Sequence, residues 1–356
     1  MSEITASVAE RVRGIVDQAI LRSVKGLEFV TAAAPTVGTT PKEVLYERGT
    51  LKLYHYLPQA DEVYRVPVLL VMATTNKAYV FDLAPGQSMV EYLLKQGFDV
   101  YVIDWEPPRP EEKNLDLADY TQDFIPTCVR CVQQDCGETD ISIVGYCMGG
   151  VLSLIYAATH LDGPLKNLAC ITTPVNWAEM GLTRIWSDEK HFDVDRLVDT
   201  LGIVPKSVVE ASFEMLRPAQ KTAGRIRVWE QIWNDEFVKS YRAFERWGNE
   251  TLPLAGEYFR QTTKELMWAN RLYKGELVVG GHKVDLANIQ VPIMHTVAEH
   301  DHIVNYKASK PLLELVGSQD KEELVLKGGH VSLIAGPNAV RRMWPALARW
   351  LGERST

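Results

Sequence analysis

The sequence predicts an α/β fold with a mostly parallel sheet, and three observations support this prediction. Short apolar runs rich in β-branched residues recur along the chain, with stretches of helical spacing between them. One of these runs, residues 141–144, leads through a Gly-rich turn directly into an apolar helical pattern. The alternation stops near Pro174 and resumes at residue 293, so an insertion is expected at this point of the sheet.

Residues 44–56 are expected to form a hairpin that turns near Arg48 and Gly49, and the later apolar runs are expected to be buried strands. These runs are residues 68–72, 100–103, 141–144, 168–172, 293–297 and 323–326. Helical patterns lie between them, among others at residues 88–98 and 338–351. Because strands alternate with helices, both faces of the sheet should be covered.

The insertion has mainly helical patterns and contains six of the nine tryptophans, namely Trp177, Trp186, Trp229, Trp233, Trp247 and Trp268. We interpret these side chains as the core of the insertion, although the wall of an apolar acyl channel would need the same residues. The predicted organisation is an N-terminal amphipathic helical segment (1–31), an α/β core (32–174 and 286–356) and a helical cap (175–285) between strands six and seven.

The N-terminal segment is expected to be one helix over residues 4–31. Val8, Val12, Ile15 and Ala19 recur at three- and four-residue steps and form one apolar face. This face is suited to pack on its own domain, on a partner helix or on an apolar particle.

Composition restricts the class of protein. The 356 residues are 46 % hydrophobic, which allows a sizeable core, and the net charge of −8 argues against a nucleic-acid partner. No apolar run is long enough to predict a transmembrane segment, and the N-terminus has no signal core. Five cysteines at irregular spacing favour the reducing cytoplasm. The C-x-x-C of Cys128 and Cys131 lies in a helical pattern without a second pair, so a structural role is expected.

The pattern G-x-C-x-G between the strand at 141–144 and the next helix is typical of a nucleophile elbow, with Cys147 at the position of the usual serine. The nucleophile of such an elbow lies on a strained turn, so its neighbours two residues away must be small. The positive N-terminus of the following helix favours a thiolate. The alternative is a buried structural cysteine in a Gly-rich turn.

A cysteine nucleophile needs a base, and the base needs an orienting acid. In the α/β-hydrolase fold the order along the chain is nucleophile, acid, histidine, each after a strand. Asp301 follows the strand expected at 293–297, and His330 lies in the Gly-rich loop after the last strand. We therefore predict a Cys147, Asp301 and His330 triad in an α/β-hydrolase fold.

Several other polar residues lie near these positions. Glu299 is the weaker candidate for the acid because it is nearer the strand end, and His302 is a candidate for substrate contact. His295 lies within a strand and is expected to be a satisfied core residue. No metal site is expected, because a strand end would splay His300 and His302 apart.

An oxyanion hole needs two backbone N–H groups. We expect one from Met148, directly after the nucleophile, and the other from Thr75 in the loop after the third strand. Asn76, next to Thr75, is a candidate for substrate binding.

The choice of cysteine favours acyl transfer from a thioester over plain hydrolysis. An acyl group moved from one thiol to another keeps its bond energy and stays reactive toward a hydroxyl. Hydrolases with a cysteine nucleophile are still compatible with the elbow.

Taken together, these segments resemble polyhydroxyalkanoate synthases. The resemblance covers roughly residues 40–352 and rests on N-K-x-Y-x-x-D-L after the third strand, Y-V-I-D-W, G-x-C-x-G-G, D-H-I-V and K-G-G-H. The short chain resembles the catalytic subunit of the two-subunit class III enzymes, or of class IV. It departs from the family at Asn305-Tyr306, where proline is expected, and at Val331-Ser332, where Ile-Gly is expected.

The resemblance implies the roles of individual residues. Cys147 matches the thiol that carries the acyl group, and His330 matches the general base. Asp301 matches an aspartate credited with activating the 3-hydroxyl of the substrate. His302 matches the histidine that follows this aspartate.

The implied activity is polymerisation of (R)-3-hydroxyacyl-CoA, with 3-hydroxybutyryl-CoA expected as the short-chain substrate, into a growing polyester chain with release of CoA. No separate cofactor is expected, because CoA is part of the substrate. An accessory synthase subunit and a homodimer are the expected assemblies, in the cytoplasm at the surface of polyester granules. The alternatives are a cysteine thioesterase or polyester depolymerase, and a granule protein without enzymatic activity.

Overall fold

The computed structural model describes residues 2–216, 218 and 220–355. Within these ranges, residues 2–11, 15, 220 and 221 are described by their backbone alone. Eight strands form one sheet in the order β1-β2-β4-β3-β5-β6-β11-β12. They are β1 (Lys42–Arg48), β2 (Leu51–Tyr56), β3 (Val68–Val71), β4 (Val100–Trp105), β5 (Ile141–Tyr146), β6 (Leu165–Ile171), β11 (Ile293–Ala298) and β12 (Lys321–Leu326). Only β1 and β2 pair antiparallel with their neighbours, and the other pairs are parallel. The sheet is therefore the α/β-hydrolase sheet that the sequence predicts.

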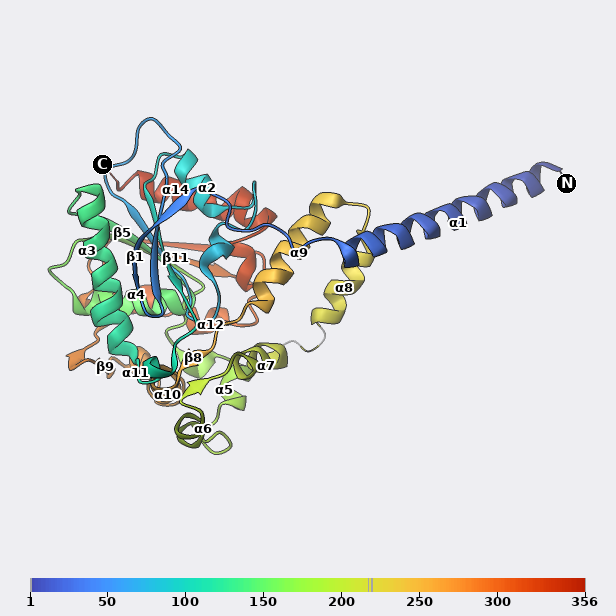
Figure 1. Cartoon of the computed structure of the whole chain (residues 1–356). Helices are drawn as coiled ribbons and strands as arrows, with labels where there is room; N and C mark the ends of the chain where they lie inside the picture. The colour runs from blue at the N-terminus through green and yellow to red at the C-terminus, as the bar shows by residue number, and fades with distance from the viewer. Residues whose placement is uncertain (1, 217, 219, 356) are drawn as a thin grey trace.

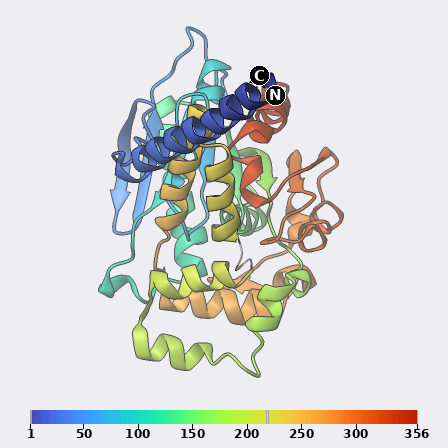
Figure 2. The ribbon, with the colours of Figure 1, turned by 90° about the vertical axis from the view of Figure 1, so that its right-hand side faces the viewer.

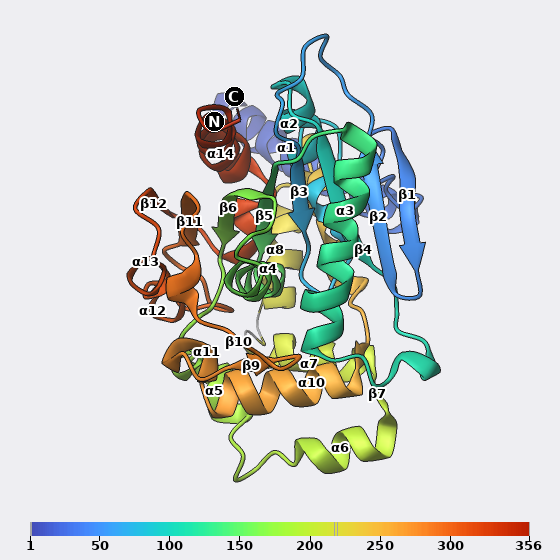
Figure 3. The ribbon, with the colours of Figure 1, turned by 90° about the vertical axis from the view of Figure 1, so that its left-hand side faces the viewer.

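Helices cover both faces of this sheet. Helices α3 (Ile125–Cys136) and α4 (Met148–Thr159) lie on one face, and α2 (Met89–Lys95) and α14 (Trp344–Gly352) lie on the other (Figure 1; Figure 3 shows the sheet from the side of α3). Every residue of β3, β4, β5 and β11 is buried, as expected for parallel strands covered on both sides. The carboxyl ends of the central strands consequently meet at one edge, where the loops carry the polar residues of interest.

Short elements complete this core. They are η1 (Ala78–Phe81), η2 (Pro110–Glu112), η3 (Asp119–Phe124), η6 (Leu286–Asn288), α12 (Tyr306–Ser309), α13 (Leu312–Leu315), η7 (His330–Leu333) and η8 (Ala339–Met343). The last of these continues into α14, so the C-terminal helical pattern of the sequence is a π-helical turn followed by an α-helix.

A long, mainly helical insertion separates β6 from β11 and lies beside the carboxyl ends of the strands (Figure 1). Its helices are η4 (Trp177–Glu179), α5 (Leu182–Trp186), α6 (Val194–Leu201), α7 (Lys206–Leu216), α8 (Gln220–Glu230), α9 (Asp235–Asn249), α10 (Gly256–Gln261), η5 (Thr262–Trp268) and α11 (Arg271–Lys274). Two small antiparallel pairs accompany them, β7 (Ile203–Val204) with β8 (Leu254–Ala255) and β9 (Val278–Val279) with β10 (His282–Lys283). The insertion falls between the sixth and seventh strands of the sheet, as expected. The exact domain boundaries remain predictions.

The tryptophans of the insertion do not all form its core. Trp177 and Trp247 are buried, whereas Trp186, Trp229 and Trp233 are exposed by 37 %, 47 % and 42 %. The interpretation of all six as core is therefore wrong for these three. Sequence spacing cannot separate the two groups, because the face of each helix that meets the sheet is set by contacts with distant segments.

The N-terminal helix α1 (Ser2–Thr31) extends away from the sheet, and only its C-terminal end meets the insertion (Figures 1 and 2). There the Arg22 guanidinium lies over the rings of Trp229 and Trp233, and Lys25 pairs with Asp235 at 3.1 Å. Val12 and Ala19 of the predicted face are exposed, while the side chains of Val8 and Ile15 lie outside the described residues. Packing of this face on its own sheet is thus excluded for the described part of the helix.

More apolar side chains of α1 share this exposure: Val16, Ile20, Leu21, Val24, Leu27 and Val30 are each at least 49 % exposed. None of the helices in the described parts of the chain combines the length and the apolar character that crossing a membrane requires.

His295 differs from its expectation as a satisfied core residue. It lies in β11 with no exposed surface, and neither ring nitrogen has a hydrogen-bond partner among the described residues. The Glu323 carboxylate is 3.8 Å from Nδ1, beyond hydrogen-bond distance. Burial therefore lowers the pKa of His295 to about 4.

This lowered pKa predicts a loss of stability in acid. An unfolded histidine binds its proton near pH 6.5, whereas folded His295 does so only near pH 4, so the free energy of unfolding should fall as the pH drops between these values. We expect wild type to lose about 3 kcal/mol relative to His295→Leu between pH 7 and pH 4. Urea unfolding of both proteins at several pH values measures this difference, and a difference independent of pH would contradict the prediction.

Candidate active site

Cys147 is placed by a strained turn between β5 and α4. Its backbone has φ 53° and ψ −119°, a conformation that L-residues other than glycine rarely adopt. A Cβ at Gly145 would overlap the backbone of Gly150, and a Cβ at Gly149 would overlap the carbonyl oxygen of Val71 in β3. The two motif glycines are therefore required by close backbone contacts, as the elbow pattern predicts.

The elbow leaves Cys147 half-buried at the start of α4. Its N–H donates to the carbonyl of Ile171 at the end of β6, which fixes the turn to the neighbouring strand. Met148 is the first residue of the helix, so its N–H has no acceptor within the helix. The Met148 N–H therefore remains the predicted oxyanion donor of the elbow.

The structure brings Asp301 and His330 together from the loops after β11 and β12. His330 Nδ1 lies 2.6 Å from Asp301 Oδ2, and the two side chains are 5 % and 1 % exposed. The other carboxylate oxygen, Oδ1, accepts the N–H groups of Ile303 and Val304 at 2.8 and 2.9 Å. Asp301 is thus held by its own loop and holds the imidazole in turn.

The charges around His330 favour its protonated form. Burial alone would lower the pKa of this imidazole, but the negative charges of Asp301 and Cys147 outweigh burial and raise the pKa to about 10. A hydrogen bond with Cys147 adds to this effect. His330 therefore interacts with the acid on one side and with the thiol on the other.

Glu299, the competing candidate for the acid, is not the carboxylate that contacts His330. Glu299 is exposed, and its N–H donates to Leu326 in the neighbouring strand. His300 is exposed, and His302 is half-buried next to Asp301. Among the residues that the structure describes, no three His, Cys, Asp or Glu side chains gather in a way that would hold a metal ion.

Tyr146, which precedes the nucleophile, was missed by the sequence analysis. Its ring lies against the His330 imidazole, with the centroids 5.1 Å apart. Its hydroxyl is buried and has no hydrogen-bond partner in the described part of the chain. The variable position of the elbow motif gave no signal for this contact.

The loop after β3 is fixed from two sides. The Lys77 ammonium pairs with Asp104 Oδ2 at 2.5 Å, and the backbone of Asn76 forms an isolated bridge with Thr251 of the insertion. The Thr75 carbonyl accepts the N–H of Leu252 at 2.8 Å. Lys77 and Asp104 thus have a structural role within the resembling motifs, whereas oxyanion binding by Thr75 and substrate binding by Asn76 or His302 stay predictions.

The residues that depart from the family pattern have local structural roles. The Asn305 side chain accepts the N–H of Lys307 and caps α12, which replaces a rigid proline by a hydrogen-bonded helix start. Val331 and Ser332 lie in the short helix that begins at His330, and the Ser332 hydroxyl donates to the Gly329 carbonyl. Each loop is thus held by a hydrogen bond between its own residues.

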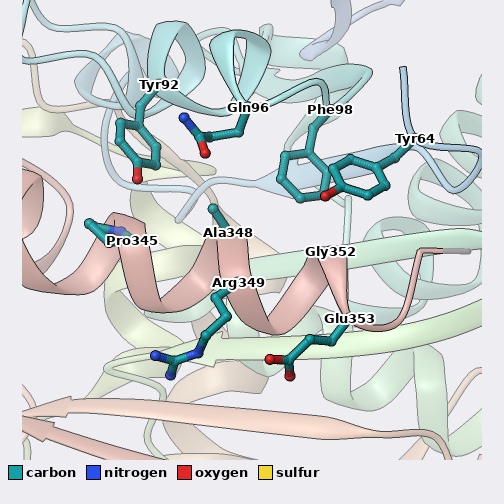
Figure 4. Close-up of a pocket in the computed structure, with 9 residues that line it drawn as sticks. All are labelled: Tyr64, Tyr92, Gln96, Phe98, Pro345, Ala348, Arg349, Gly352 and Glu353. Atoms are coloured by element: carbon teal, nitrogen blue, oxygen red, sulfur yellow. The ribbon is translucent and has the colours of Figure 1, made fainter. Parts of the chain in front are cut away.

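A separate hollow of about 420 Å³ lies between α2 and α14 (Figure 4). It is lined by Tyr64, Tyr92, Gln96, Phe98, Pro345, Ala348, Arg349, Gly352 and Glu353. None of the predicted catalytic residues contributes to this lining, so the hollow is separate from the candidate site.

Comparison with known proteins supports the fold. Residues 67–337 match the family described as alpha/beta hydrolase fold. Among solved structures, a carboxylesterase of Nitrososphaera gargenis aligns with a TM-score of 0.53 at 18 % identity, over 88 % of this chain and 99 % of the esterase. A thermophilic esterase of Thermogutta terrifontis aligns with a TM-score of 0.51 at 17 % identity, over 91 % and 99 % of the two chains.

Sequence relatives define the family more narrowly. Residues 21–93 match the family described as Poly-beta-hydroxybutyrate polymerase (PhaC) N-terminus. The poly(3-hydroxyalkanoate) polymerase subunit PhaC of Haloferax mediterranei is 35 % identical over 327 residues, which are 91 % of this chain and 66 % of the relative. The protein of the same name from Allochromatium vinosum is 34 % identical over 335 residues, 93 % of this chain and 94 % of the relative. The chain therefore belongs to the poly(3-hydroxyalkanoate) polymerase family and has an α/β-hydrolase fold.

Proposed function

We propose that this protein polymerises (R)-3-hydroxyacyl-CoA, with 3-hydroxybutyryl-CoA as the expected short-chain substrate, into polyester with release of CoA. The observation that carries the proposal is the 2.6 Å contact between His330 and Asp301 beside a cysteine on a nucleophile elbow. The names of the relatives support polymer formation over other acyl transfers. No separate cofactor takes part in the proposed reaction.

In the first step the thiol loses its proton to His330, and Cys147 Sγ attacks the thioester carbonyl. The carbonyl oxygen gains negative charge, which the Met148 N–H and a second N–H, expected from Thr75, stabilise. The bond from the carbonyl carbon to the CoA sulfur then breaks. The departing sulfur takes the proton from His330, so free CoA leaves and the acyl group remains on Cys147.

In the second step the terminal 3-hydroxyl of the polyester chain attacks the carbonyl of the acyl thioester on Cys147, so that the leaving group is the Cys147 sulfur. The hydroxyl proton is taken by the His330 and Asp301 pair, a C–O ester bond forms, and the C–S bond breaks. The thiol regains a proton, and the polyester is one unit longer. Asp301 contributes either by activating this hydroxyl or by orienting His330, and these two roles predict different kinetics.

The second candidate function is hydrolysis by the same triad. The similarity to esterase structures favours it as the alternative, because water in place of the 3-hydroxyl would yield a free acid. The test is CoA release from 3-hydroxybutyryl-CoA with analysis of the product. Polymer supports the synthase, and free 3-hydroxybutyrate in equal amount to CoA would establish the hydrolase.

Replacing Cys147 tests the nucleophile. Cys147→Ala should lower CoA release by about 10³-fold or more and abolish acyl labelling of the protein, because the variant lacks the thiol on the elbow beside His330. Cys147→Ser should leave little activity, since an oxygen ester is a poorer acyl donor. Mass spectrometry of the acylated protein and a CoA assay measure both effects. A Cys147→Ala protein with more than a trace of CoA release would exclude this mechanism.

Replacing His330 and Asp301 separates the two steps. His330→Gln should slow acylation by about 10²- to 10⁴-fold, because the thiol then lacks its base. Asp301→Asn should retain part of the acylation but block elongation if the carboxylate serves the hydroxyl. Rapid quenching with trapping of the acyl protein measures each step. Equal losses in both steps of Asp301→Asn would show that Asp301 only orients the imidazole.

We further propose that a small helical accessory subunit, at the granule surface, raises the activity of the chain. The relatives' names include the word subunit, and the extended α1 helix exposes apolar side chains that a partner would cover. The partner would favour an open position of the cap, which is fixed to the loop after β3 through Thr75 and Leu252. The alternative assembly is a homodimer that is active alone.

The chain purified alone should be at least about fivefold less active than the chain with a co-expressed accessory subunit. Val16→Ser with Ile20→Ser should weaken co-purification of the subunit, because both side chains are at least half exposed on α1. Asp17→Ser is the matched control, since it changes an exposed polar residue of the same helix. Full activity of the isolated chain without a lag would exclude the partner requirement, and unchanged co-purification would exclude only the docking site.

A further inference from the structure

Two hydroxyl groups meet between the sheet and the insertion. Thr74 lies in the loop after β3, and Tyr258 lies in α10 of the insertion. The Thr74 hydroxyl donates to Tyr258 Oη at 3.1 Å. Both residues are buried, with 4 % and 2 % of their surface exposed. We refer to these two residues as the hydroxyl pair.

The hydroxyl pair lies beside the nucleophile elbow. Val71, the last residue of β3, pairs with Gly145, and its carbonyl lies so close to Gly149 that a Cβ there would overlap it. The loop that carries Thr74 therefore starts against the first turn of α4, which begins directly after Cys147. The contacts of Thr75 with Leu252 and of Asn76 with Thr251 hold the insertion on this same loop.

The influences on the pKa of Tyr258 agree with a position of the hydroxyl pair beside Cys147. Burial raises the pKa of Tyr258, the bond from Thr74 lowers it, and the negative charge of Cys147 raises it further. Tyr258 accordingly keeps its proton at neutral pH and is a donor. The charge of the nucleophile acts on this hydroxyl, although the two residues come from different layers of the fold.

One proton of the hydroxyl pair has no acceptor in the protein. The Thr74 proton is used in the bond to Tyr258, so the phenol proton must find another acceptor. Among the described residues none accepts it, and the neighbouring Tyr120 contributes its ring, with the centroids 4.6 Å apart. A buried O–H without an acceptor costs free energy, and an oxygen of a bound substrate would remove this cost.

The proposed substrate carries such an oxygen. A 3-hydroxyacyl group has a hydroxyl two carbons from the carbonyl that reacts with Cys147, and a plain acyl group does not. When this hydroxyl enters a site closed to water, it needs a donor or an acceptor from the protein. The phenol O–H supplies a donor, and the lone pairs of the Thr74 oxygen supply an acceptor.

We propose that the hydroxyl pair of Thr74 and Tyr258 binds the 3-hydroxyl of the acyl group on Cys147 and thereby selects 3-hydroxyacyl thioesters over plain acyl thioesters. The proposal rests on the proposed function, because it names the feature of that substrate which the site recognises. Thr74 and Tyr258 are specificity-determining residues. The insertion is then part of the specificity site, since it provides one of the two hydroxyls.

The test compares the acylation of Cys147 by 3-hydroxybutyryl-CoA and by butyryl-CoA in single-turnover experiments. The wild type should prefer the hydroxylated substrate. Tyr258→Phe should reduce this preference by about tenfold or more, through slower acylation by 3-hydroxybutyryl-CoA at an unchanged rate with butyryl-CoA. Thr74→Val should also reduce the preference for 3-hydroxybutyryl-CoA. Thr74→Ser keeps the hydroxyl and should therefore retain the preference of the wild type.

Tyr120→Phe is the matched control, because it removes a hydroxyl from the buried ring that packs on Tyr258 without altering the pair. It should leave the preference unchanged. Thermal unfolding of each variant shows whether the fold is retained, and the Thr74→Ser and Thr74→Val comparison keeps the test decisive if Tyr258→Phe does not fold.

Three outcomes would overturn the proposal. They are a wild type that acylates equally fast with both thioesters, a Tyr258→Phe protein in which both acylation rates fall equally, and a Tyr258→Phe protein in which neither acylation rate changes. Failure of the proposed function gives a different result. Without a catalytic Cys147 neither thioester would acylate the wild type, and with a hydrolase the acyl group would leave Cys147 as a free acid in place of polymer.

Discussion

The close contact between the elbow and strand β3 is the constraint on which the site depends. Cys147 can adopt a positive φ only because the glycines on either side let the backbone of α4 approach Val71 and let the turn fold on Gly150. A side chain at either glycine would push the helix from the sheet edge. The strain at Cys147 is offset by the packing of β5 and α4, whose apolar residues are buried except for half-buried Met148.

The same contact places the loop after β3 next to the elbow. The loop after β3 starts at the elbow, and its far end is held by the Lys77 ion pair with Asp104 and by the backbone of the insertion. A displacement of the insertion would therefore be transmitted to the loop expected to provide the second oxyanion donor. The four residues Thr74 to Lys77 thus join the elbow to the insertion through one short loop.

Burial has different consequences for the protonation of His295, in β11, and of His330, in η7 after β12. His330 has a carboxylate at 2.6 Å and a thiol nearby, so its protonated form is favoured despite burial. His295, inside β11, has no partner within hydrogen-bond distance, and burial therefore favours its neutral form. One histidine is suited to hold a proton during the reaction, and the other is a cost to stability in acid.

The sequence by itself determined the strands, the elbow and the order of Cys147, Asp301 and His330, because each depends on a local pattern of apolar residues, glycines and strand ends. It also carried motifs that resemble one family, and the relatives confirm that family. The tertiary structure decided the contacts between distant segments: which tryptophans are exposed, how α1 extends from the body, and that Tyr146 meets His330. Thr74 and Tyr258 are 184 residues apart, and no periodicity relates them. Their pairing arises only when the insertion folds onto the sheet edge, because side-chain contacts of this kind follow from the packing of whole layers.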